Sequence, residues 1–224
     1  MNNWVYLSYP LSVELSAYGN GNRIEINEAR SISRGDTSNN SVISLSSHLG
    51  THIDFPLHFS ELGKSIDDYN SDFFIFNKVA MISLENKSKS DKLIIELDEI
   101  IEELGEVSEN IELLILKTGF GAFRDKEQYW QKGFGIGLNI ASYLRKRFPF
   151  LKAIGFDLIS LNSYQHRELG RKSHGEFLVE NDILIIEDMD LSKIKNNSNI
   201  ELIITSPLRV KGAEAAPLTI FAKI

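Results

Sequence analysis

Residues 47–59 read SHLGTHIDFPLHF and hold three of the five histidines of this 224-residue chain, together with one aspartate. Side chains of an extended chain alternate between two faces. The even positions carry the polar groups, which are His48, His52, Asp54 and His58. Most odd positions are apolar, namely Leu49, Ile53, Phe55, Leu57 and Phe59. We therefore expect an extended segment with one apolar face on a core and one face of imidazoles and a carboxylate.

A helix would also bring His48 and His52 together, because residues four apart share a helix face. The local sequence disfavours a helix, since it contains Gly50, Pro56 and two β-branched residues, Thr51 and Ile53. Proline is confined to the edges, ends or bulges of strands. We therefore expect Pro56 to bend the segment and to move His58 off a strict line.

Nitrogen and oxygen donors that converge without sulfur are typical of catalytic sites for divalent cations such as Zn²⁺ or Mn²⁺. A carboxylate such as Asp54 can also bridge two cations. The alternative is the polar face of an edge strand, with histidines that bind only the backbone. Three histidines and an aspartate in register, opposite an apolar face, favour a metal site with one or two ions.

The composition limits the partners and the compartment. A net charge of −7 and a pI near 5.3 argue against non-specific binding to nucleic acid or to an anionic membrane. The absence of cysteine excludes disulfides and thiolate ligands and suits the cytoplasm. The first residues resemble no signal peptide, and no apolar run approaches the ~20 residues of a membrane span. We expect one soluble cytoplasmic domain over residues 1–224.

Short apolar runs rich in Ile, Val, Leu and Phe predict strands. They are residues 24–32, 42–45, 79–84, 111–117, 153–156, 183–186, 202–205 and 218–222. Helical periodicity predicts helices over 98–105, which Gly105 ends, and over 139–148, which Pro149 ends. Many strands and few helices indicate a strand-rich α/β domain with a curved mixed sheet and outer helices. The helices are too few for a regular βαβ array.

The eleven residues HLGTHIDFPLH at 48–58 match the pattern His-x-Gly-Thr-His-x-Asp-x-Pro-x-His. This pattern resembles the cyclase family of metal-dependent hydrolases, which includes bacterial kynurenine formamidases and isatin hydrolases. The resemblance extends over nearly the whole chain. Further segments that are similar to the family are LILKTGFG at 114–121, AIGFDLIS at 153–160, HGEFLVENDILIIEDMDL at 174–191 and GAEAAPLTIFA at 212–222. The resemblance implies a swivelling β/β/α-like fold and a homodimer or a larger homo-oligomer.

The resemblance also implies roles for particular residues. The metal ligands would be His48, His52, Asp54, His174 and Glu187, with Asp54 as the bridge if two ions bind. The catalytic acid/base would be His58. His166 is a rival of His174, and the residues that follow His174 fit the family better. Without the resemblance, His174 would be interpreted as a loop histidine and Glu187 as a solvent-facing charge.

The segment YQHRELGRKSHGEF at 164–177 departs from typical kynurenine formamidases, which leaves the substrate open. Arg167 and Arg171 could bind an anionic group of the substrate through charge-assisted hydrogen bonds. Equally, the segment could be a solvated helix, because 167/171 and 168/172 are spaced four apart.

The leading functional hypothesis is a metal-dependent hydrolase that cleaves an amide, cyclic amide or ester bond of a small molecule. The alternatives are a metal-dependent cyclase or dehydratase, and a metal-dependent binding protein without turnover.

Overall fold

The computed structural model describes residues 3–15, 17–21, 23–85, 93–196 and 198–224. Its main element is a nine-stranded sheet with the order β5-β12-β13-β4-β11-β10-β8-β6, in which β1 pairs with β13 off this path. The strands are β1 (Trp4–Tyr6), β4 (His52–Asp54), β5 (Ile75–Phe76), β6 (Val79–Ser83), β8 (Leu113–Lys117), β10 (Ala153–Phe156), β11 (Leu184–Glu187), β12 (Leu202–Pro207) and β13 (Ala215–Lys223).

The sheet is mixed, as predicted. On one side, β6, β8, β10 and β11 run parallel to one another. On the other side, β4, β13, β12 and β5 are joined by antiparallel pairing, and β4 is also antiparallel to β11. The long strand β13 connects the two arrangements, because residues 215–217 pair with β4 whereas residues 218–223 pair with β12. β4 therefore lies in the interior of the sheet.

The predicted strands of the parallel side are confirmed, and their composition has a simple cause. Strands of a parallel sheet are covered on both faces and therefore read as continuous apolar runs. Leu113, Leu114, Ile115 and Leu116 of β8 are all fully buried, as are the apolar residues of β11.

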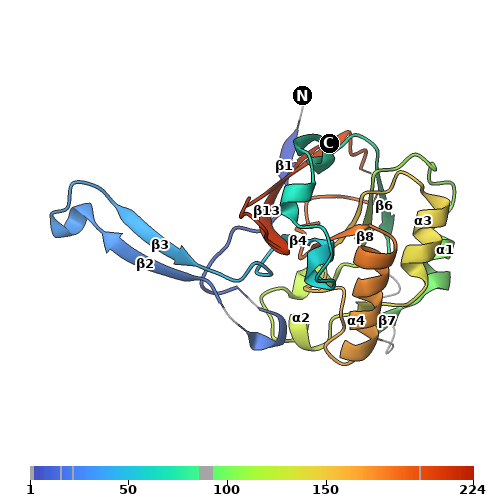
Figure 1. Cartoon of the computed structure of the whole chain (residues 1–224), viewed down its shortest axis with the longest axis horizontal. Coiled ribbons are helices and arrows are strands. Elements are labelled where there is room, and N and C mark those ends of the chain that lie inside the picture. Colours follow the sequence, from blue (N-terminus) through green and yellow to red (C-terminus); the bar gives the residue numbers. More distant parts are fainter. Residues whose placement is uncertain (1–2, 16, 22, 86–92, 197) are drawn as a thin grey trace.

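Four α-helices occur in the described part of the chain: α1 (Leu97–Leu104), α2 (Gln128–Gln131), α3 (Ile140–Arg147) and α4 (Arg167–Gly175). Figure 1 shows α1, α3 and α4 on the outside of the sheet. α1 and α3 confirm the two predicted helices. Short 3₁₀ turns lie at Tyr18–Asn20, Ile32–Arg34, Pro56–His58, Ile66–Asp68, Ser71–Phe74 and Phe120–Phe123. None of the described helices is long and apolar enough to cross a membrane.

Helix α4 contains the segment for which the sequence left two interpretations open, and both remain compatible with a helix. The segment is helical and continues into a π-helical turn at Glu176–Glu180. Its buried face contains Gly170, Ser173 and His174. Gly170 packs so closely on Asn162 that a Cβ atom would lie 1.6 Å from the Asn162 Oδ1 atom. A larger residue at this position would therefore have to displace the Asn162 side chain.

Two strands that the sequence predicts lie outside the main sheet. β2 (Glu25–Arg30) and β3 (Asn40–Ser44) form a separate antiparallel hairpin, and every residue in both strands is exposed. Figure 1 shows this hairpin as an arm that projects from the body. A further short pair consists of β7 (Ile94–Ile95) and β9 (Gly135–Ile136), which are parallel.

Candidate metal centre

The register of β4 against β11 places the first pair of site residues. His52 pairs with Glu187, and residues paired across two strands point to the same face of a sheet. Asp54 lies two residues beyond His52, so it shares that face. The His52 Nε2 atom is 3.3 Å from Glu187 Oε2 and 3.4 Å from Asp54 Oδ1. All three residues are buried.

Helix α4 supplies a further imidazole. The His174 Nε2 atom lies 3.4 Å from Glu187 Oε1 and 3.8 Å from Asp54 Oδ2, and His174 is buried. His166 lies at the start of the same helix and is exposed. The structure thus brings His174, and not His166, to the cluster.

The expected strand geometry is wrong for His48, whereas the expected bend at Pro56 is confirmed and takes His58 off the strand. Only residues 52–54 form a strand, because Gly50 turns the chain at φ +67° and Pro56 begins a 3₁₀ turn. Both turns nevertheless fold back toward Asp54. The His48 Nδ1 atom is 3.0 Å from Asp54 Oδ1, and the rings of His48 and His58 are 4.2 Å apart between centroids. All four polar residues of the opening segment therefore converge, although turns rather than alternation bring the outer two together.

The cluster has the chemistry that a divalent cation needs. His52, Asp54 and Glu187 each offer one nitrogen or oxygen atom, and these three atoms lie within 4.8 Å of one another. The same holds for one such atom each of His48, Asp54 and His58. The buried atoms His52 Nε2 and Asp54 Oδ1 make no hydrogen bond. An unsatisfied buried polar atom costs about 1–3 kcal/mol, so a further partner at this place is expected. Imidazole nitrogens and carboxylate oxygens suit Zn²⁺ or Mn²⁺, and the residues present therefore fit such an ion.

Hydrogen bonds hold the buried side chains in place. The Nδ1 atoms of His52 and His174 lie 2.8 Å and 2.9 Å from the backbone carbonyl oxygens of Gly50 and Gly170. A ring that donates its Nδ1–H to a carbonyl directs its Nε2 atom at the cluster. The backbone N–H of Leu161 donates to Glu187 Oε1 at 2.6 Å.

Two histidines of the same motif have pKa values shifted in opposite directions. Burial lowers the pKa of His52, but the charges of Asp54 and Glu187 outweigh burial and raise it to about 9. Burial lowers the pKa of His58, Asp54 opposes this effect, and the nearby imidazoles of His48 and His174 add to the lowering. His58 is therefore neutral at pH 7 and can accept a proton.

The two arginines considered for substrate binding are both exposed on α4. The Arg167 guanidinium lies over the ring of Tyr164, at 4.0 Å from the ring centroid. Burial raises the pKa of Tyr18, Arg167 lowers it and Glu187 raises it. Both Arg167 and the buried carboxylate of Glu187 therefore affect the pKa of Tyr18. Tyr18 in this way links Arg167 electrostatically to the edge of the cluster. Within the described part of the chain, no such connection is seen for Arg171.

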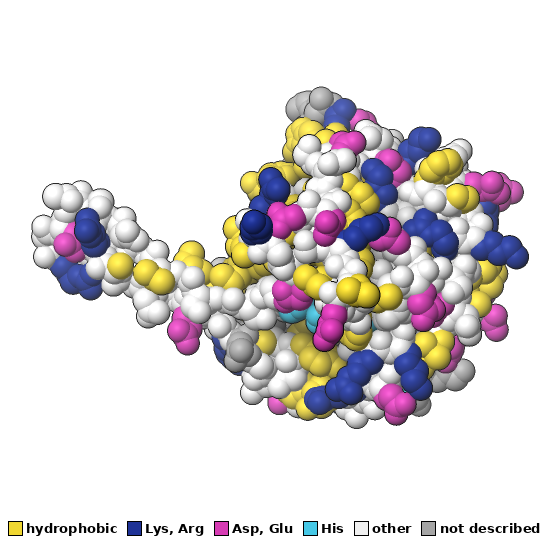
Figure 2. Space-filling model, viewed as in Figure 1, with side chains coloured by type: hydrophobic (Ala, Val, Ile, Leu, Met, Phe, Trp, Pro, Cys, Tyr) yellow, Lys and Arg dark blue, Asp and Glu magenta, His cyan; other side chains and the backbone are white. Residues whose placement is uncertain are grey.

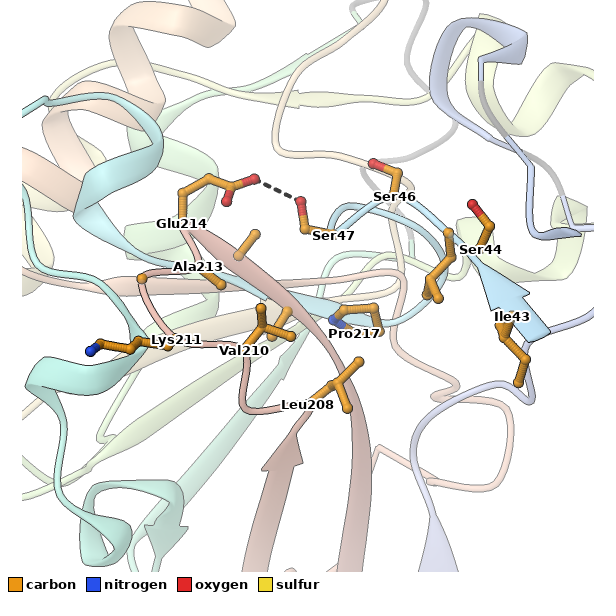
Figure 3. A pocket seen from close by; sticks show the side chains of 14 residues that line it. Ile43, Ser44, Ser46, Ser47, Leu208, Val210, Lys211, Ala213, Glu214 and Pro217 are labelled. Carbon is orange, nitrogen blue, oxygen red and sulfur yellow. Dashed lines mark hydrogen bonds between the residues drawn. The ribbon is translucent and has the colours of Figure 1, made fainter. Parts of the chain in front are cut away.

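The sequence did not point to two further residues. Glu214 Oε1 lies 3.3 Å from His48 Nε2 and accepts a hydrogen bond of 2.7 Å from Ser47 Oγ (Figure 3). The family pattern Gly-Ala-x-x-x-Pro leaves this position free. Asp188 follows Glu187 with φ +54° and forms a buried ion pair with Arg124 at 2.6 Å. No local signal in the sequence marks either contact.

Comparisons with known proteins show the family and the fold of the chain. A family model described as "Putative cyclase" matches residues 5–163. Kynurenine formamidase of Bacillus cereus is 24% identical over 217 residues, which cover 97% of this chain and 95% of that protein. Cyclase-like protein 3 of Oryza sativa subsp. japonica is 25% identical over 197 residues, which cover 84% of this chain and 67% of that protein.

Solved structures share the fold over the whole chain. Isatin hydrolase A from Labrenzia aggregata has a TM-score of 0.81 and 18% identity, with 100% of this chain and 94% of that chain covered. A "predicted metal-dependent hydrolase" from Bacillus stearothermophilus has a TM-score of 0.75 and 19% identity, and the match covers 100% of this chain and 98% of that chain.

Proposed function

Because the chain belongs to the cyclase family, whose model matches residues 5–163, we propose that it is a metal-dependent hydrolase of small molecules. The bond cleaved is an amide, cyclic amide or ester. The observation that carries this proposal is the convergence of three imidazoles and two carboxylates around His52 Nε2 and Asp54 Oδ1, which are buried without a hydrogen bond. The likeness to proteins named kynurenine formamidase and isatin hydrolase supports the class of bond.

The proposed metal ligands are His48, His52, Asp54, His174 and Glu187. Asp54 belongs to both groups of candidate ligands, so it is the residue that two cations would share. Zn²⁺ and Mn²⁺ both suit this donor set. A divalent cation held there supplies Lewis-acid chemistry, because it lowers the pKa of water toward about 7 and polarises a carbonyl oxygen.

We assign the proton transfers to His58. Its ring lies 4.2 Å from that of His48 and 6.1 Å from that of His174 between centroids, so it faces the space in which the reacting atoms would lie. Its lowered pKa leaves it neutral and able to take a proton from the attacking water. It can then deliver this proton to the leaving nitrogen or oxygen of the substrate.

Substrate recognition is assigned to the exposed arginines of α4. Arg167 and Arg171 would bind an anionic group of the substrate. Arg167 is the better supported of the two, because its guanidinium lies over the ring of Tyr164 and lowers the pKa of Tyr18, which Glu187 raises.

The test of the proposed function joins metal content to product analysis. Purified protein dialysed against metal-free buffer and reloaded with Zn²⁺ or Mn²⁺ should hold one or two equivalents and hydrolyse formamides, cyclic amides or lactones. Solvent oxygen-18 should enter the product, which a cyclase or dehydratase reaction would not require. Asp54→Asn should abolish both results, whereas Asp125→Asn, which changes an exposed aspartate, should abolish neither. Wild-type protein that holds no metal after reloading would contradict the proposal.

We also propose that the chain is a cytoplasmic, single-domain protein that forms a homodimer through its arm. An isolated two-stranded hairpin is marginally stable in water, yet the arm exposes Ile26, Val42 and Ile43 by 48%, 58% and 57%. Figure 2 shows apolar side chains along the arm and histidine atoms on the body near its base. Exposed apolar surface of this kind is typical of an interface.

Sedimentation of the full chain tests the assembly. The wild type should sediment as a dimer, and Ile43→Asp should shift it to the monomer because a charge cannot be buried in an apolar contact without cost. Thr37→Asp adds the same charge at the tip of the arm and should leave the dimer intact. A monomeric wild type would contradict this part of the proposal.

A further inference from the structure

The three histidines proposed as ligands differ in what holds their second ring nitrogen. In His52 and His174 this nitrogen is Nδ1, and its partner is a backbone carbonyl oxygen, that of Gly50 or Gly170. In His48 the two ring nitrogens exchange places, so that Nδ1 and not Nε2 faces the cluster. Its Nδ1 atom faces Asp54 Oδ1 at 3.0 Å, and its Nε2 atom faces the carboxylate of Glu214 at 3.3 Å. His48 is thus held by a charged side chain where the other two are held by the main chain.

The position of Glu214 is fixed independently of His48. Glu214 directly precedes β13, and its backbone carbonyl accepts the N–H of Phe55 at 2.9 Å, immediately after β4. Its side chain is oriented by Ser47, whose hydroxyl donates to Glu214 Oε1 at 2.7 Å. Figure 3 shows the two side chains directed toward each other across the wall of an open cavity of about 610 Å³. Ser47 and Glu214 therefore form a preformed support beside the imidazole of His48.

We propose that Glu214 is a positioning residue for the metal ligand His48. Its carboxylate accepts the hydrogen on His48 Nε2, which leaves Nδ1 unprotonated and directed at the space shared with Asp54 and His58. A carboxylate behind a ligating imidazole fixes its tautomer and increases its basicity more than a neutral carbonyl does. This inference rests on the proposed metal site and adds a residue to it that the family motif does not contain.

The exposure of Glu214 and His48 distinguishes a positioning role of Glu214 from a role in stabilising the fold. The side chains of Glu214 and His48 are 39% and 27% exposed, so removal of the carboxylate leaves no buried charge unpaired. The metal-free fold should therefore be insensitive to substitution of Glu214, and the effect should be confined to the orientation of His48 and to the affinity for the cation.

The experiment combines Zn²⁺ competition against a chromogenic chelator, thermal unfolding of the metal-free protein and ¹⁵N shifts of the histidine rings. Glu214→Ala should weaken Zn²⁺ binding about 10- to 100-fold and shift the His48 ring away from the Nε2–H tautomer, with the metal-free Tm unchanged. Glu214→Gln keeps an oxygen acceptor without the charge and should lose less affinity. Glu201→Gln is the matched control, because Glu201 is a half-exposed glutamate paired with Lys223 elsewhere on the sheet.

The outcomes separate the positioning role of Glu214 from the proposed metal-dependent function. Wild-type Zn²⁺ affinity in Glu214→Ala, or His48 ring shifts identical to the wild type, would overturn the role of Glu214 while the metal site stands. A weaker affinity with no change of the His48 tautomer would mean that Glu214 acts only as a distant charge, which also overturns the positioning role. A wild type without Zn²⁺ would overturn the proposed function itself. Comparable losses in Glu201→Gln would show that the effect is not specific.

Discussion

The inner and outer parts of the candidate centre use the same kinds of donor but are built differently. The inner part consists of His52, His174 and Glu187, which are buried and held by strand register and by main-chain hydrogen bonds. The outer part consists of His48 and His58, which lie on turns and are partly exposed. The comparison teaches that the fold itself fixes the inner part, whereas side chains such as Glu214 fix the outer part.

The largest contrast is expected when one histidine is removed from each part. Loss of one partner from a buried charge cluster leaves the remaining charges uncompensated and costs about 3–5 kcal/mol. His52→Ala should therefore lower the free energy of unfolding of the metal-free protein by about this amount and also abolish cation binding. His48→Ala should weaken cation binding but change this free energy by less than about 1 kcal/mol. Urea unfolding in the presence of a chelator measures both, and equal losses would erase the distinction between the two parts.

The next prediction separates His58 from the ligands. His58→Ala should keep the full metal content but lower kcat by about 10²- to 10⁴-fold, the usual contribution of general acid/base catalysis. Elemental analysis and steady-state kinetics on the same preparation provide the measurement. Loss of metal in this variant would make His58 a ligand and would leave the proton transfers without an assigned residue.

The opposite pKa shifts of His52 and His58 give a pH test. The folded pKa of His52, about 9, lies above its ordinary value of 6.5. Protonated His52 therefore stabilises the metal-free protein fully below pH 6.5, and this contribution is lost as the pH rises through about 9. The Tm of the metal-free protein should fall over this range, and His52→Gln should weaken that dependence, to which the raised pKa of His174 also contributes. A Tm that stays constant from pH 6.5 to 9 in the wild type would contradict the charge assignment.

The smallest effect is expected at the exposed edge of the centre. Arg167→Gln should raise KM several-fold with little change in kcat, since an interaction made equally in the ground state and the transition state affects binding alone. Arg171→Gln should have a smaller effect, because no contact connects Arg171 to Tyr18 or Tyr164. Kinetics with an anionic and a neutral substrate of the same class test this, and identical KM values for both arginine variants would reject the preference for Arg167.

Much of the fold could be predicted because its local patterns agree with its tertiary structure. The strands β8, β10 and β11 are recognisable as buried apolar runs, and helices α1 and α3 end beside Gly105 and Pro149 as expected. The arm could be predicted as strands but not as an arm. Whether a hairpin joins a sheet depends on packing against distant residues, which the exposed sequence of β2 and β3 does not encode.

The site divides in the same way. His48, His52, Asp54 and His58 could be found because they are close in sequence, although Gly50 replaces the expected alternation with a turn. His174 and Glu187 required the resemblance to the cyclase family, because no local pattern links them to β4. Glu214 lies at a position that the family pattern leaves free, and its contact with His48 joins residues that are far apart in the sequence. Only the three-dimensional structure could reveal it.

The place of β4 has a consequence for the order of assembly. Both strands that flank β4, namely β11 and β13, are synthesised long after β4. β4 therefore has neither neighbouring strand until β11 has been synthesised, and it gains the second only when β13 follows. Contacts of such long sequence separation form slowly. A chain that stops before β13 leaves β4 as an edge strand beside β11. Completion of the proposed cation site therefore depends on synthesis as far as β13.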